Sequence, residues 1–384
     1  MTFLETAERL GARLCRDAIW HQGRCTWLSD LLRGDDRIVH GPIGPDLYTG
    51  SAGIAYFLRE LASVTGEPVF ARTAAGALQQ TLAILSRVPP TSRQGFYCGW
   101  AGIAWVLAQA GRREEALSLV HELPPSPAGE ADLVSGTAGL VAALCSLARI
   151  TTERALLDLA WQHGDALLKQ ARVTEAGHSW HSLQPKKPQP HLTGFSHGAA
   201  GIGWALLELG TATGEARFVH AAEEAFRYER THFSAAQGNW PDYRFNPPGF
   251  MRVWCHGAGG IAFSRLRAWQ LLGDPRYREE AEIGLAAVEP VVAKPNFADF
   301  SLCHGVAGNA ALLLYAETVL GRSASAAIQA AQAGVAHYEE QRLPWAGGRA
   351  GRETPGFMLG LAGIGSFYLQ LAERGRHPSA LLPL

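Results

Sequence analysis

The sequence has little charge, few cysteines and no long apolar run. Only 18% of its 384 residues are charged and the formal net charge is −1, so no global field would attract nucleic acid or an anionic membrane. Six widely spaced cysteines are typical of free thiols in a reducing compartment. No apolar run reaches about 18 residues, and the start lacks a signal-peptide pattern. We therefore expect a cytoplasmic protein without a membrane span or a nucleic-acid partner.

Glycine and apolar residues are abundant instead, with 43 glycines and 47% hydrophobic residues. A Gly-x-x-Gly motif opens each of seven segments that are apolar on nearly all sides, and an amphipathic segment such as 221–228 follows. A helix that is apolar all round is buried on all sides, whereas an amphipathic helix keeps one wet face. The motifs begin at Gly50, Gly99, Gly136, Gly198, Gly257, Gly305 and Gly360.

Alternating buried and half-exposed helices, repeated seven times, predict an all-α fold, an α/α toroid of seven inner and seven outer helices. An open α-solenoid follows the same helical-pair logic, but the strong apolarity of the inner helices favours closure. We expect residues 1–384 to form a single domain, with residues 1–46 as an N-terminal helical lead-in. Within that lead-in, residues 3–28 have the apolar spacing of a helix or a helix pair.

Stretches rich in Pro, Gly and turn-forming residues lie just before several of the motifs. In a closed ring these loops would gather at one mouth, together with the N-termini of the inner helices. Unpaired N–H groups and helix dipoles favour an anion or a thiolate there. We expect function at this mouth. The stretches are residues 123–131, 174–194, 234–253 and 343–356.

Two of the motifs carry Cys-His directly before their first glycine. Cys255, Cys303 and His304 offer the thiolates and imidazole that zinc prefers, and three such ligands leave the fourth tetrahedral position open, as in catalytic zinc sites. Small cysteines also pack at crowded helix ends without binding anything. The recurrence of Cys-His in register with the repeat favours a metal, and we predict one zinc ion per chain.

Other polar residues fall at the same mouth. His197 and His256 directly precede a motif and could act as acid–base groups near neutral pH, or as helix-start histidines bonded to carbonyls. Asp132 could orient a histidine or handle a proton, although a cap or turn role is as plausible. Arg252 could stabilise a developing anion, or be a surface charge. Trp240, Asp242 and Arg244 could line the approach to the site, although a purely structural turn is the favoured interpretation.

Together these features resemble the lanthionine synthetase C-like (LanC-like) cyclase family. The resemblance covers nearly the whole chain, from residues 47–55 to residues 355–365, and is most specific in Phe-Ser-His-Gly at 195–198, Trp-Cys-His-Gly at 254–257 and Cys-His-Gly at 303–305. It implies an α/α toroid with one zinc ion at its mouth, bound at the positions predicted above as metal ligands.

The resemblance also implies a reaction. The family's peptide cyclases add a peptide cysteine to dehydroalanine or dehydrobutyrine and form lanthionine or methyllanthionine rings. His197 would supply the proton that the enolate needs, with Asp132 and Arg252 as supporting polar positions. The family's stand-alone bacterial cyclases often carry Tyr after the first zinc cysteine. This chain has His256 there, and so is closer to the C-terminal cyclase domain of bifunctional lanthipeptide synthetases.

We therefore expect a zinc-dependent lanthipeptide cyclase that acts on a dehydrated precursor peptide made by a separate dehydratase or kinase-like enzyme. One alternative keeps the zinc and thiol chemistry but adds glutathione or another thiol to dehydroamino acids. Another is a non-catalytic scaffold that presents a peptide to partner enzymes. Glycosidases also use α/α toroids, but they need two positioned carboxylates, and Asp132 has no obvious partner.

Overall fold

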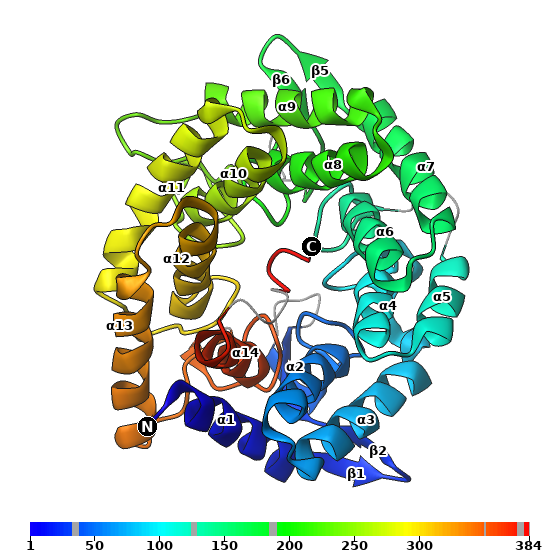
Figure 1. The fold of residues 1–384 in the computed structure, drawn as a ribbon, viewed down its shortest axis with the longest axis vertical. Coiled ribbons are helices and arrows are strands. Elements are labelled where there is room, and N and C mark those ends of the chain that lie inside the picture. Colours follow the sequence, from blue (N-terminus) through cyan, green and yellow to red (C-terminus); the bar gives the residue numbers. More distant parts are fainter. Residues whose placement is uncertain (33–37, 124–128, 184–189, 349–350, 375–379, 384) are drawn as a thin grey trace.

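The computed structural model describes residues 1–32, 38–123, 129–183, 190–348, 351–374 and 380–383, and their helices form two concentric rings (Figure 1). The inner helices are α2 (Ser51–Thr65), α4 (Trp100–Gln109), α6 (Thr137–Thr151), α8 (Ala199–Thr213), α10 (Ala258–Leu272), α12 (Val306–Leu320) and α14 (Leu361–Ala372). The outer helices are α3 (Pro68–Ala83), α5 (Arg113–His121), α7 (Ala155–Gln170), α9 (Ala216–Thr231), α11 (Pro275–Ala293), α13 (Ser325–Gly334), which continues as a π-helix over Val335–Glu340, and α1 (Phe3–Asp17). Neighbouring inner helices pack against one another around the whole ring, with α14 returning to α2.

The loops that lead into the inner helices, here called the mouth loops, are joined by a closed circle of backbone hydrogen bonds. In each loop, the residue two positions before the first glycine of the motif donates its N–H to the equivalent carbonyl in the next loop, at 2.7 to 3.3 Å. The residues are Tyr48, Tyr97, Val134, Ser196, Cys255, Cys303 and Met358, which donates back to Tyr48. An open solenoid would leave its end loops unpaired. The predicted α/α toroid is therefore confirmed.

Burial follows the apolar pattern of the sequence. All residues from 199 to 210 in α8 are buried, whereas the following outer helix α9 buries one face and leaves the other wet. This matches the prediction that fully apolar segments form the inner ring and amphipathic segments the outer ring. Among the described residues, no helix combines the length and apolarity that crossing a membrane requires.

The second glycine of each motif lies so close to a carbonyl of the preceding mouth loop that a side chain would not fit. A Cβ on Gly308 would lie 1.8 Å from the carbonyl oxygen of Leu302, and a Cβ on Gly102 would lie 1.7 Å from that of Phe96. The other five motifs show the same approach, at 1.8 to 2.3 Å. The first turn of each inner helix therefore packs directly on the loop that precedes it, a contact that a methyl group would block.

The N-terminal lead-in differs from the prediction. The helix ends at Asp17, and antiparallel hairpins follow, β1 (Ile19–His21) with β2 (Arg24–Thr26) and β3 (Leu28–Leu32) with β4 (Ile38–Pro42). The prediction of helix beyond Asp17 is wrong because Gln22 and Gly23 have positive φ and form a tight hairpin turn. The helix α1 itself packs on α14 and completes the outer ring. A further hairpin joins β5 (Arg172–Thr174) to β6 (Gly177–Ser179).

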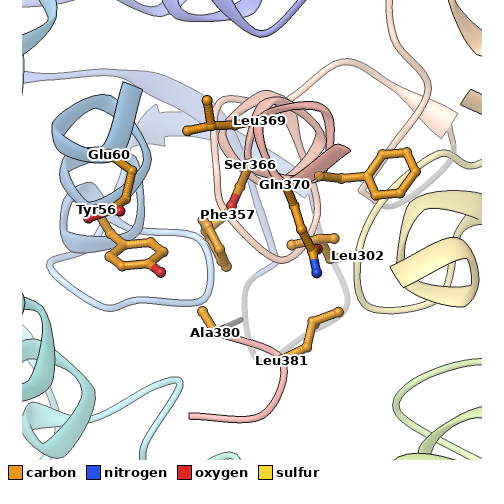
Figure 2. A pocket seen from close by; sticks show the side chains of 10 residues that line it. Tyr56, Glu60, Leu302, Phe357, Ser366, Leu369, Gln370, Ala380 and Leu381 are labelled. Atoms are coloured by element: carbon orange, nitrogen blue, oxygen red, sulfur yellow. The ribbon is translucent and has the colours of Figure 1, made fainter. Parts of the chain in front are cut away.

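Residues 380–383 lie in the centre of the ring (Figure 1). The carbonyl of Ala380 accepts a hydrogen bond from the Tyr97 hydroxyl at 2.8 Å, and the carbonyl of Leu381 accepts one from the Trp254 indole at 3.1 Å. Figure 2 shows Ala380 and Leu381 across a small pocket from Phe357. Of the expected mouth-loop stretches, residues 124–128, 184–189 and 349–350 lie outside the described residues.

Candidate metal centre and acid–base residues

The predicted metal ligands come from two adjacent mouth loops, those that lead into α10 and α12. Cys255 and Cys303 occupy equivalent positions, and the N–H of Cys255 donates to the carbonyl of Cys303 at 3.2 Å. Their sulfur atoms and a ring nitrogen of His304 all lie within 4.8 Å of one another. Two thiols and one imidazole at this spacing could hold a metal ion, and this donor set suits zinc.

A carboxylate orients the imidazole of this cluster. Nε2 of His304 lies 3.2 Å from Oδ2 of Asp299, whose Oδ1 accepts a hydrogen bond from the backbone of Ser301 at 2.7 Å. The contact is an ion pair when the imidazole is charged, and a carboxylate beside a metal-binding histidine commonly supports the orientation of the ring.

The charges of the three side chains are linked. The hydrogen bond from Cys303 lowers the pKa of Cys255 and, with a further bond from His304, outweighs the effect of burial. Burial, reinforced by the Cys255 thiolate, raises the pKa of Cys303. Burial opposes a charged His304, but Cys255 and Asp299 outweigh it and raise its pKa. Because metal ligands must be deprotonated, a metal ion would displace the protons of Cys303 and His304.

His197 and Asp132 form a second pair at the mouth. Nδ1 of His197 lies 2.6 Å from Oδ2 of Asp132, a carboxylate with no exposed side-chain surface. The same oxygen accepts a hydrogen bond from Ser182 at 3.1 Å, and Oδ1 accepts one from the N–H of Ser135 at 2.7 Å. The imidazole is 17% exposed. Asp132 therefore orients His197, as one interpretation of the sequence proposed, and its Nδ1 contact leaves Nε2 available.

His256 differs from His197 although the two rings stack at a centroid distance of 5.8 Å. Its side chain is 1% exposed, and its Nε2 lies 3.3 Å from the hydroxyl of Ser196. Burial, aided by the positive charge of Arg244, lowers its pKa to about 3. A neutral, enclosed imidazole is poorly suited to deliver a proton to a bound substrate near neutral pH.

The arginine whose charge lies beside these residues is Arg244. Arg252 is exposed, and its side chain makes no hydrogen bond or ion pair with any described residue. Arg244 instead forms a two-pronged ion pair with Asp242, whose Oδ2 lies 3.9 Å from Nδ1 of His256. Its charge also contributes to the lowered pKa of Cys255. Asp242 and Arg244 therefore lie beside the residues of the site and do more than form a structural turn.

Two further residues of the site were missed from the sequence. The hydroxyl of Tyr48 donates a hydrogen bond to Sγ of Cys303 at 2.8 Å. Burial first, and then the neighbouring cysteines, raise the pKa of Tyr48, so the phenol keeps its proton. Its register, two residues before a motif, is the same as that of the ligand cysteines and could have identified it. Asp299 shows no comparable signal, because nothing in its spacing separates it from an ordinary turn aspartate.

The sequence and the fold both resemble those of known proteins. A protein from Danio rerio named glutathione S-transferase LANCL1 is 26% identical over 283 residues, which cover 68% of this chain and 67% of that protein. A probable SapB synthase from Streptomyces coelicolor is 37% identical over 110 residues, which cover 28% of this chain and 11% of the synthase. The chain thus matches only part of each of these relatives.

The solved structure of nisin cyclase has the same fold, with a TM-score of 0.65 at 17% identity over 85% of this chain and 88% of the cyclase. The sequence also matches the family described as lanthionine synthetase C-like protein over residues 41–382, and this range contains all the mouth loops. The chain therefore belongs to the lanthionine synthetase C-like family.

Proposed function

We propose that this protein is a zinc-dependent cyclase that adds peptide cysteine thiols to dehydroalanine or dehydrobutyrine and forms thioether rings. The observation that carries the proposal is the cluster of Cys255, Cys303 and His304 beside the His197–Asp132 pair, in consecutive mouth loops of one toroid. The names of the relatives support it, since they include a probable SapB synthase and, among solved structures of the same fold, nisin cyclase.

The donor set fits zinc, because two sulfurs and one imidazole leave room for a fourth ligand. A zinc ion held there would deprotonate a substrate thiol at neutral pH and so supply the nucleophile. In the addition, the thiolate forms a C–S bond to the β-carbon of the dehydroamino acid, and the electron pair of the double bond moves to the α-carbon. The peptide keeps both partners close, which favours ring formation.

His197 would then donate a proton from Nε2 to the α-carbon, which completes the thioether. The Nδ1–Asp132 hydrogen bond holds the ring and leaves Nε2 without a hydrogen-bond partner among the described residues. His256 is enclosed beside it and would support the ring stack without exchanging protons with the substrate. Arg244, whose positive charge acts on Cys255, would stabilise the developing anion, a role that the sequence had suggested for Arg252 as an alternative to a surface charge.

A second candidate keeps the same residues and changes the thiol. The Danio rerio relative is named a glutathione S-transferase, so glutathione addition to dehydroamino acids is a specific alternative. A non-catalytic scaffold would need neither the ligand cluster nor an oriented histidine, and both are present.

The test is to incubate the purified protein with a dehydrated peptide that contains cysteine, in parallel with a dehydrated peptide that lacks cysteine plus glutathione. Ring formation leaves the peptide mass unchanged and blocks alkylation of its thiol, whereas glutathione addition raises the mass. We expect the first outcome, with slower ring closure and retained zinc in His197→Ala. Glutathione addition without ring closure would replace the cyclase proposal by the second candidate.

A further inference from the structure

Tyr48 contacts a predicted metal ligand but has no part in the proposed reaction. Its hydroxyl oxygen lies 2.8 Å from Sγ of Cys303 and donates the hydrogen bond. In the circle of mouth loops, the loop of Met358 separates those of Tyr48 and Cys303. The tyrosine side chain therefore reaches past one complete loop to meet this sulfur.

Both partners of the contact are held from several sides. The N–H of Tyr48 donates to Tyr97 at 2.9 Å, and its carbonyl accepts the N–H of Met358 at 2.7 Å. Its ring packs edge-on against the ring of Tyr97, at a centroid distance of 6.4 Å. Cys303 is 3% exposed, and its N–H donates to the carbonyl of Met358 at 3.0 Å. The hydroxyl–sulfur contact is thus built into the circle of loops.

We propose that Tyr48 is a positioning residue of the metal centre, whose hydroxyl donates a hydrogen bond to the Cys303 thiolate when that sulfur binds a metal ion. The inference rests on the proposed function, which takes Cys303 as a ligand. Groups that hydrogen-bond to metal ligands fix their orientation and tune the metal.

The hydrogen bond also makes the Cys303 thiolate, a metal ligand, different from the thiolate of the substrate. A bond donated to sulfur withdraws electron density and lowers its nucleophilicity. Cys303 then remains a ligand and does not compete with the substrate thiol for the electrophilic dehydroamino acid.

The test compares Tyr48→Phe with Tyr97→Phe, which removes the hydroxyl bonded to Ala380 and leaves Cys303 untouched. In the cobalt-loaded protein, Tyr48→Phe should move the sulfur-to-cobalt charge-transfer band to longer wavelength, since the sulfur becomes more electron-rich. It should weaken cobalt binding about tenfold in a chelator competition. In the zinc-loaded protein, iodoacetamide should alkylate Cys303 several-fold faster, as measured by peptide mass spectrometry. Tyr97→Phe should leave all three readouts unchanged.

The proposal would be overturned if Tyr48→Phe left the charge-transfer band, the cobalt affinity and the alkylation rate unaltered. It would also be overturned if Tyr97→Phe changed them equally, because the effect would then come from altered packing and not from the lost hydrogen bond. If Tyr48→Phe fails to fold, 3-fluorotyrosine incorporated into the wild-type chain makes the hydroxyl a stronger donor. The band should then move to shorter wavelength, and an unmoved band would refute the hydrogen bond. None of these readouts involves ring closure, so their failure leaves the cyclase proposal intact.

Discussion

Replacing Asp132 with Asn tests the role of the acid–base pair. The Nδ1–Oδ2 distance of 2.6 Å and the complete burial of the carboxylate indicate a charge-assisted hydrogen bond. Such a bond contributes about 1.5 to 3 kcal/mol. If this contribution is lost from the transition state, and about 1.4 kcal/mol corresponds to a tenfold change in rate, ring closure should slow by about 10- to 150-fold. The Asn side chain can still accept the N–H of Ser135, so the loop should keep its shape.

The assay is a single-turnover reaction, quenched with N-ethylmaleimide and read by mass spectrometry as the loss of alkylatable peptide thiol. The matched control is Ser182→Ala, which removes a longer hydrogen bond of 3.1 Å, from an uncharged donor, to the same oxygen and should slow the reaction by about tenfold or less. Both variants should retain zinc, because neither residue is a predicted ligand. A full ring-closing rate in Asp132→Asn would refute the assignment of His197 as an oriented proton donor.

Other predictions concern the stability of the toroid. His163 in α7 is buried, neither of its ring nitrogens has a partner among the described residues, and burial lowers its pKa to about 4. Between about pH 6.5 and pH 4 the imidazole of His163 binds a proton in the unfolded chain but not in the folded chain. The free energy of unfolding therefore decreases as the pH falls through this range, by up to about 1.4 kcal/mol per pH unit. His163→Leu should flatten the stability measured by urea unfolding over this range, and an unchanged slope would contradict it. Gly308→Ala should destabilise by about 1 to 3 kcal/mol in the same assay, because its Cβ would lie 1.8 Å from a carbonyl oxygen. Gly249→Ala, whose Cβ would approach nothing closer than 3.4 Å, should change stability by less than about 0.5 kcal/mol, and equal effects would refute the packing argument.

The ring and its ligand cluster could be predicted because each inner helix repeats the same local requirement. The glycine pair that allows the first turn of an inner helix to pack on the preceding loop is visible in the sequence. The residues just before each pair therefore fall in the circle of mouth loops. Cys255 and Cys303 share one position in that circle, and His197 and His304 share the next. Residues at equivalent positions before neighbouring motifs therefore lie close together in space.

Contacts that depend on how the longer loops fold were not visible in the sequence. The stretch before α10 folds back through isolated bridges, Asp242 with Gly249 and Arg252 with Gly257. This path brings Arg244 close to the cluster and leaves Arg252 outside it, the reverse of what distance along the chain from Cys255 suggests. The hairpins after Asp17 were missed because a short stretch of mixed apolar and polar residues such as 19–28 is compatible with either helix or strand.

The most direct test of the central claim is a zinc titration of the ring-closing rate. Protein stripped of metal with a chelator should be inactive, and its rate should rise linearly with added zinc and stop at about one zinc ion per chain. Cys303→Ala should bind no zinc in this range and stay inactive. A full rate in protein shown by elemental analysis to hold no metal would contradict the account.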